Sequence, residues 1–167
     1  LKYRVTYLEM NRKPSFDWPK NLKHKLSILL AESFPAWYFL FFYKQVGKNY
    51  YWTDWLRKSE DEIDEFVNDK NVLLYTLIKD GWPVGFYMLD YRKKDICDLS
   101  FFGLVDEVIG IGLGKYLLQT AILTAWDSKK IKKLTVNTCS LDHKSAIYLY
   151  QKYGFTPVKY KDLEKTV

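Results

Sequence analysis

The chain has 167 residues, and 26 lysines and arginines against 20 aspartates and glutamates give it a formal net charge of +6. Its 48% apolar residues support a sizeable core, and its 18% aromatic residues exclude a disordered chain. Two cysteines and two histidines exclude a disulfide-stapled scaffold, and no metal site is predicted. The positive charge indicates an anionic partner without choosing among a nucleotide, a nucleic acid and a membrane.

No membrane span and no secretion signal are expected. The longest apolar stretch, residues 34–43, is half of what a bilayer helix needs. The first residues lack the charged-then-apolar layout of a signal peptide. With only two cysteines, the chain is predicted to be cytoplasmic.

The first seventy residues mix strand and helix signals. β-branched and aromatic residues over 3–8 predict a strand, and the prolines that follow favour a loop. Residues 25–31 form a short apolar run in which a strand cannot be separated from a helix start. A continuous apolar face over 35–46, followed by Gly47, predicts a buried helix.

A second helix is predicted over residues 59–68. Ser59 is the expected N-cap, and acidic residues fill the first turn, where they complement the helix dipole. After this helix the strand signals dominate. Strands are predicted over residues 72–79, 83–91, 96–105, 131–139 and 155–161, and helices over 112–129 and 142–153. This order predicts an α/β (α+β) protein with a mixed sheet.

One glycine-rich segment, Ile109-Gly110-Ile111-Gly112-Leu113-Gly114-Lys115, joins a predicted strand to a predicted helix. Glycines at alternate positions allow a tight turn with converging N–H groups, and the helix adds the positive end of its dipole. The segment therefore predicts a seat for a phosphate or pyrophosphate, with a plain turn into a helix as the alternative. Its spacing departs from G-x-G-x-x-G and from the G-x-x-x-x-G-K-[ST] phosphate loop, which weakens both nucleotide interpretations.

Residues 105–118 resemble the acyl-CoA loop of the GNAT acetyltransferase superfamily, whose pattern is Gln/Arg-x-x-Gly-x-Gly/Ala. Gly112 and Gly114 match the two small positions, whereas Ile109 stands where Gln or Arg is usual. Residues 145–155, SAIYLYQKYGF, resemble the superfamily signature A-x-x-L-Y-x-K-x-G-F. The resemblance covers residues 72–158, and the two motifs together are similar to one branch of bacterial GNAT proteins of obscure function.

The resemblance implies a GNAT fold with a mixed, mostly antiparallel central sheet, splayed parallel strands and flanking helices. We expect one domain over residues 1–167, with an acyl-CoA-binding core over 72–158 and an acceptor-side region over 1–70. Acetyl-CoA is the implied co-substrate, bound by a strand edge and by backbone N–H groups of the glycine loop. The implied binding residues are Phe102, Gly103, Leu104, Val105, Ile109, Gly110, Ile111, Gly112, Leu113, Gly114, Lys115, Asn137 and His143.

Two residues are predicted to be catalytic. Tyr150 matches a tyrosine that in many GNAT enzymes protonates the leaving thiolate, the alternative being a packed core tyrosine. Asp98 falls near the position of a glutamate base in the histone-acetylating branch, and it would act best through a water. Asp98, Ser100 and Phe102 are expected to share one strand face, and a surface carboxylate is the alternative for Asp98. A base role for His143 also stays open.

The predicted function is direct transfer of an acetyl group from acetyl-CoA to a primary amine of a small molecule or a protein. A non-catalytic acyl-CoA sensor is one alternative. A nucleic-acid binder using Lys129, Lys130, Lys132 and Lys133 is the other. We expect no nucleic-acid or membrane partner and a monomer or homodimer. The aromatic residues of the first seventy positions are expected to be mostly core, with a few lining an acceptor pocket.

Overall fold

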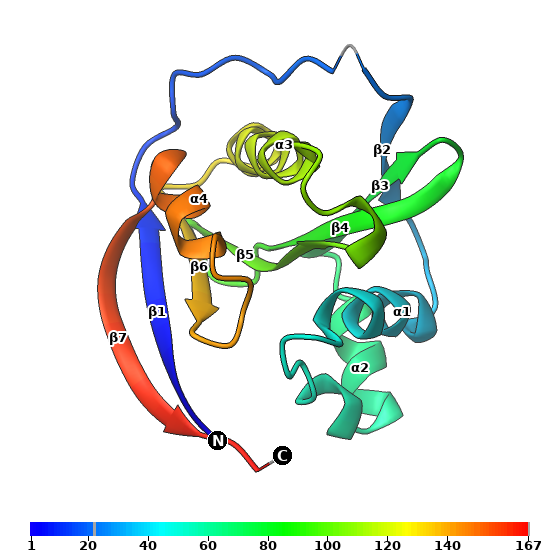
Figure 1. The fold of residues 1–167 in the computed structure, drawn as a ribbon, viewed down its shortest axis with the longest axis vertical. Coiled ribbons are helices and arrows are strands. Elements are labelled where there is room, and N and C mark those ends of the chain that lie inside the picture. The colour runs from blue at the N-terminus through cyan, green and yellow to red at the C-terminus, as the bar shows by residue number, and fades with distance from the viewer. Residues whose placement is uncertain (22, 167) are drawn as a thin grey trace.

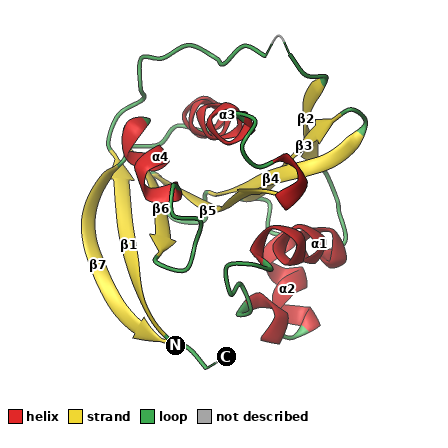
Figure 2. Ribbon diagram, viewed as in Figure 1, coloured by secondary structure: helices red, strands yellow, loops and turns green. Residues whose placement is uncertain are grey.

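The computed structural model describes residues 1–21 and 23–166. Its main elements are β1 (Lys2–Met10), β2 (Leu26–Ala31), α1 (Ala36–Gly47), α2 (Glu60–Val67), β3 (Val72–Lys79), β4 (Trp82–Asp90), β5 (Ile96–Leu104), α3 (Leu113–Ser128), β6 (Lys133–Cys139), α4 (Ala146–Lys152) and β7 (Thr156–Glu164). Short 3-10 turns cover Trp55–Arg57 and Asp106–Val108. Figure 1 shows these elements in chain order, and Figure 2 shows the strands gathered into one curved sheet with helices on both sides.

The sheet has seven strands in the order β2-β3-β4-β5-β6-β1-β7. Every neighbouring pair is antiparallel except β5 and β6, which are parallel. Between the described residues, that parallel pairing ends at Asp98 and Thr135. Each strand nevertheless continues along its outer neighbour, β5 beside β4 to Leu104 and β6 beside β1 to Cys139. The sheet therefore opens at its centre, and the predicted mixed sheet with splayed parallel strands is confirmed.

Helices α1 and α2 cover one face of the central strands, and α3 covers the other. Strand β4 shows this by alternation, because successive side chains in a strand point to opposite faces. Phe86 and Met88 belong to the buried cluster with α1 and α2. Tyr87 and Leu89 belong to the cluster with α3. The strand is buried on both faces, which fixes its register.

A β-bulge at Ser100 corrects the predicted face of β5. Met88 of β4 pairs with Phe101, whereas the next residue of β4, Leu89, pairs with Leu99, so Ser100 is an extra residue. Beyond the bulge the alternation is reversed. Phe101 packs with the α1–α2 cluster, and Phe102 packs against the α3 cluster. The expectation that Phe102 shares a face with Asp98 and Ser100 is therefore wrong.

The structure also shows the outcome of three further predictions. The ambiguous run over residues 25–31 is the edge strand β2, paired with β3. The helix predicted over 142–153 is shorter and begins at Ala146, because the Asp142 carboxylate accepts the N–H of Cys139 and ties this segment to the end of β6 as a turn. The capping box at Ser59 forms as predicted, with Ser59 and Glu62 bonding each other's backbone N–H groups.

Within the described ranges, no helix combines the length and apolar character needed to cross a bilayer.

Candidate functional site

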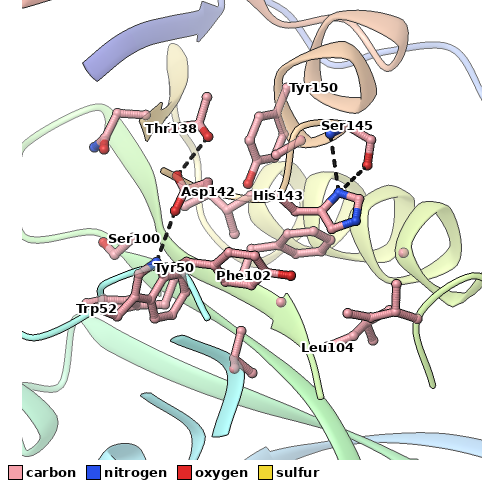
Figure 3. A pocket seen from close by; sticks show the side chains of 18 of the residues that line it. Tyr50, Trp52, Ser100, Phe102, Leu104, Thr138, Asp142, His143, Ser145 and Tyr150 are labelled. Atoms are coloured by element: carbon pink, nitrogen blue, oxygen red, sulfur yellow. Dashed lines mark hydrogen bonds between the residues drawn. The ribbon is translucent and has the colours of Figure 1, made fainter. Parts of the chain in front are cut away.

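The opening between β5 and β6 leads into a cavity of about 390 Å³, here named the splay cavity. Its floor is β5 from Leu99 to Leu104. Its remaining walls come from α1 and the following loop, from the glycine loop, and from the end of β6 with α4. These wall residues are Val46, Tyr50, Trp52, Ile109, Gly110, Gly114, Asn137, Thr138, Asp142, His143, Ser145, Ala146 and Tyr150. Figure 3 shows their side chains converging from these separate elements.

A smaller pocket of about 250 Å³, here named the aromatic pocket, adjoins the splay cavity. The two share a wall made of Tyr50, Trp52, Ser100, Phe101, Asn137 and Asp142. The residues found only in the aromatic pocket are Tyr3, Val5, Tyr43, Tyr51, Asp54, Trp55, Cys139, Leu141 and Lys165. A molecule in the splay cavity and a molecule in the aromatic pocket would meet at the shared wall.

The glycine loop forms one end of the splay cavity. Gly110 and Gly112 have φ angles of +89° and +87°, in the left-handed region where a side chain is strained. Gly112 is the N-cap of α3, so the first N–H groups of this helix have no intrahelical acceptor. Among the described residues, the N–H groups of Gly110, Ile111 and Gly112 donate to no backbone carbonyl. The loop therefore offers several N–H groups without a backbone acceptor beside a helix N-terminus, which are the groups that bind an anion.

The floor of the cavity is an unpaired strand edge. Beyond Asp98, the side of β5 that faced β6 has lost its partner strand, and backbone groups of Phe102 to Leu104 border the opening. Gly103 also allows α1 to pack closely, since a Cβ there would lie 2.3 Å from a methyl carbon of Val46. Val105 does not extend this edge. Its N–H donates to Val84, and its carbonyl accepts from Val108.

The other predicted loop residues lie around the cavity in different ways. Leu113 is buried in the core, with its side chain away from the cavity lining. Ile111, Gly112 and Lys115 are exposed beside the opening. The Lys115 stem lies next to the loop, because a Cβ added to Gly112 would be 4.0 Å from Lys115 Cε.

Tyr150 of α4 lines the splay cavity. Its ring packs edge-on against Phe102 and Phe155, and the residue is 6% exposed. Among the described residues no hydrogen bond engages its hydroxyl, which lies at the cavity wall (Figure 3). Burial raises the pKa of Tyr150, and the charges of Asp142 and Asp98 raise it further. The hydroxyl is therefore held protonated and has a proton to donate.

Asp142 is a residue of the site that the sequence analysis did not predict. Its carboxylate accepts three hydrogen bonds, from Trp52 Nε1 at 3.0 Å, Thr138 Oγ1 at 2.8 Å and the Cys139 N–H at 2.7 Å (Figure 3). It thereby links the loop after α1 to the end of β6, across the shared wall. The sequence does contain one indication of this role. Asp142 lies three residues after the end of β6, and an aspartate in such a place typically accepts a hydrogen bond from the nearby backbone.

His143 and Asn137 both line the splay cavity. The Nδ1 atom of His143 accepts the Ser145 N–H at 3.2 Å and lies 2.6 Å from Ser145 Oγ. Because Nδ1 is an acceptor, the neutral ring carries its proton on Nε2. His143 can therefore donate from Nε2 while its ring is held in place.

Asp98 lies at the last β5–β6 pair and outside the lining of the splay cavity. It accepts hydrogen bonds from Thr135 Oγ1 at 2.6 Å and Ser100 Oγ at 2.9 Å. Burial raises its pKa, although these two hydrogen bonds act in the opposite direction. Ser100 lines both cavities at the shared wall, and its hydroxyl donates to the Asp98 carboxylate. Asp98 is therefore linked to the cavities through the Ser100 hydroxyl.

The lysine cluster after α3 is largely engaged. Lys132 pairs with Asp95 at 3.6 Å and Lys133 with Glu9 at 3.2 Å. Lys129 donates to Asn71 and lies over the Tyr91 ring. Within the described residues, no group of three or more His, Cys, Asp or Glu side chains is arranged to hold a metal ion.

Comparison with known proteins identifies the family. The sequence model of the acetyltransferase (GNAT) family matches residues 31–155, which is most of the chain. The chain therefore belongs to the acetyltransferase (GNAT) family. Among curated protein sequences, none matches.

Solved structures share the fold at low sequence identity. A functionally unknown conserved protein from Staphylococcus epidermidis superimposes with a TM-score of 0.65 at 12% identity, over 97% of this chain and 60% of that one. A GNAT family acetyltransferase from Elizabethkingia anophelis with acetyl-CoA bound gives 0.58 at 22% identity, over 80% and 78%. An aminoglycoside acetyltransferase from a soil metagenomic sample, in complex with sisomicin, gives 0.57 at 14% identity, over 76% and 84%. The chain thus spans less than two thirds of the Staphylococcus protein.

Proposed function

We propose that the chain is an N-acetyltransferase that moves an acetyl group from acetyl-CoA directly to a primary amine. The observation that carries this proposal is the opening of β5 from β6, with the glycine loop at one end of the resulting cavity and the Tyr150 hydroxyl in its wall. Family membership and the acetyl-CoA bound to the Elizabethkingia relative support the same donor.

The residues around the splay cavity fit this donor. Unengaged N–H groups at Gly110 to Gly112 and the start of α3 suit a pyrophosphate. The unpaired edge at Phe102 to Leu104 suits the pantetheine amides, which would add to it as a strand does. Nε2 of His143 and the Asn137 amide offer further polar contacts. Of the acceptor-side region over residues 1–70, the loop after α1 forms much of the aromatic pocket.

The bound thioester supplies an activated acyl carbon. The chain positions the two reactants and supplies the groups that donate and accept protons. Tyr150, whose hydroxyl burial keeps protonated, would donate to the departing sulfur. Ser100 would accept a proton from the amine as its own proton passes to Asp98, whose pKa is raised towards the range useful for a base. Placing both reactants against the shared wall lowers the barrier through proximity.

Direct transfer is preferred over an acyl-enzyme. Cys139 borders the aromatic pocket, but burial raises the pKa of its thiol, and the Asp142 charge raises it further. A thiol held protonated is a poor nucleophile. The reaction can therefore proceed without a covalent intermediate on the chain.

The test is thiol release from acetyl-CoA by the purified chain over a panel of primary amines, with mass spectrometry of the products. We expect at least one amine to yield equal amounts of free CoA and N-acetyl product. Binding of CoA without acetyl transfer to any amine would replace this proposal with the acyl-CoA sensor.

A further inference from the structure

We propose that the acceptor is a short linear diamine, held with one ammonium at Asp54 and its reacting amine at Asp142. This inference rests on the proposed acetyl transfer and names its substrate class. It starts from the aromatic pocket, which carries one carboxylate at the shared wall and another away from it. Two carboxylates joined by an aromatic passage are complementary to two cations joined by an apolar chain.

An alkylammonium already lies in this pocket. The side chain of Lys165, which follows β7, is 12% exposed, and its Nζ donates to the Tyr51 carbonyl at 2.8 Å. The same nitrogen lies 3.1 Å from Asp54 Oδ1. An unbranched four-carbon chain ending in an ammonium is therefore accommodated by the residues of the pocket.

A diamine would replace this occupant by exchanging one ammonium for another. The Asp54 side chain is 67% exposed, so its carboxylate is accessible to a ligand although the Lys165 side chain is only 12% exposed. The Lys165 backbone exchanges hydrogen bonds with Leu1, so only the Lys165 side chain would have to withdraw. The ligand ammonium would then take over the Tyr51 carbonyl and the Asp54 carboxylate.

The other end of the pocket has one acceptor position to spare. A carboxylate offers about four lone-pair sites, and Asp142 uses three, for Trp52, Thr138 and Cys139. The unused site belongs to Oδ1, which otherwise accepts only Trp52 Nε1. An amine there would lie at the shared wall that Ser100 also lines, and Ser100 leads to Asp98.

The size of the aromatic pocket favours a small acceptor. The aromatic pocket has about 250 Å³, whereas pockets for drug-sized ligands have roughly 300–1,000 Å³. The soil acetyltransferase binds sisomicin, which is much larger than a diamine. The rings of Tyr43, Trp55 and Tyr51 line a space suited to a methylene chain and a cation.

The experiment compares 1,3-diaminopropane, 1,4-diaminobutane and 1,5-diaminopentane with n-butylamine and sisomicin in the acetyl-CoA assay. We expect kcat/KM for the best diamine to exceed that of n-butylamine about tenfold. This is the effect expected from the one additional charge-assisted hydrogen bond that the second ammonium makes. Asp54→Asn should reduce this ratio about tenfold, whereas the exposed Asp61→Asn, which makes the same charge change on α2, should preserve it. Lys165→Met keeps the stem, removes the competing ammonium and should lower the diamine KM.

Calorimetric titration of CoA-loaded protein with 1,4-diaminobutane separates this inference from the proposed function. If n-butylamine or sisomicin matches the diamines, or if Asp54→Asn leaves the ratio unchanged, the diamine site is wrong while acetyl transfer stands. Diamine binding that depends on Asp54, without transfer to any amine, would keep the site and remove the enzymatic proposal. Absence of both binding and transfer overturns both.

Discussion

The splay cavity and the aromatic pocket share one wall but are built from different groups. Beyond that wall the splay cavity combines backbone, at the free edge of β5 and at the glycine loop, with side chains such as Tyr150 and His143. The aromatic pocket is bordered by side chains from β1, the loop after α1, the end of β6 and Lys165. Backbone donors recognise a ligand whatever the side chains are, whereas side chains select by size and charge. In the proposed reaction the donor site is therefore generic and the acceptor site is particular to this chain.

The largest expected effect tests the chemistry on the splay-cavity side. Tyr150→Phe removes the only group of that side chain with a proton to give, so kcat should fall about 100-fold while CoA affinity stays within twofold. Stopped assays for turnover and calorimetry for CoA binding measure the two quantities. Tyr148→Phe is the matched control, because Tyr148 is 72% exposed on the same helix. Equal losses in both variants would remove Tyr150 from the mechanism.

The next effect tests the connection between the two cavities. Asp98→Asn keeps an oxygen for Thr135 and Ser100 but cannot take a proton, so kcat should fall about tenfold. Because burial raises the pKa of Asp98, the wild-type rate should rise with pH as this carboxyl ionises. The variant should lose that limb of the pH–rate profile. If the pH–rate profile of the variant keeps the wild-type shape, a base other than Asp98 takes the proton of the amine.

A smaller effect tests whether the splay cavity recognises its ligand through backbone. Gly112→Ala and Gly81→Ala place a Cβ at nearly the same positive φ, +87° and +89°, and each should destabilise the fold by about 1–2 kcal/mol. Gly81 lies in the β3–β4 turn, whereas Gly112 caps α3 at the cavity. Only Gly112→Ala should weaken CoA binding, by about tenfold. Urea unfolding and calorimetry separate the two effects, and similar CoA affinities would contradict the loop assignment.

The smallest effect is on stability. The folded state raises the pKa of Asp98, so it binds this proton more tightly than the unfolded chain does. The stability of the wild type relative to Asp98→Asn should be greatest below the ordinary carboxyl pKa. It should decline as the pH rises through the folded pKa of Asp98. Urea unfolding of both proteins across that interval measures the difference, and a constant difference would mean that Asp98 titrates as it does in the unfolded chain.

The sequence predicted elements whose determinants are local. The N-cap at Ser59 and the turn of the glycine loop into α3 both depend on residues a few positions apart, and both formed where expected. The mixed sheet followed from the order of these elements. The bulge at Ser100 was missed because it depends on how β5 pairs with β4, which no local pattern records.

The same distinction applies to the candidate site. The glycine loop and Tyr150 belong to contiguous motifs, and both lie around the splay cavity. Asp142 was missed because its importance comes from Trp52, ninety residues away in the chain, whose ring nitrogen donates to it. Lys165 was missed for the same reason, because its partner Asp54 is distant in sequence. Long-range pairs of this kind appear only once the chain is folded.

The bulge at Ser100 also bears on how the two sites of the proposed reaction are separated. Phe101 and Phe102 are adjacent in sequence, yet they pack on opposite faces of the sheet. Phe101 lines both cavities, whereas Phe102 and the two residues that follow it line the splay cavity but not the aromatic pocket. Deletion of Ser100 would exchange the two faces and disrupt both sites together. In the proposed reaction, one inserted residue thus separates a side chain that borders both sites from side chains that border the donor site alone.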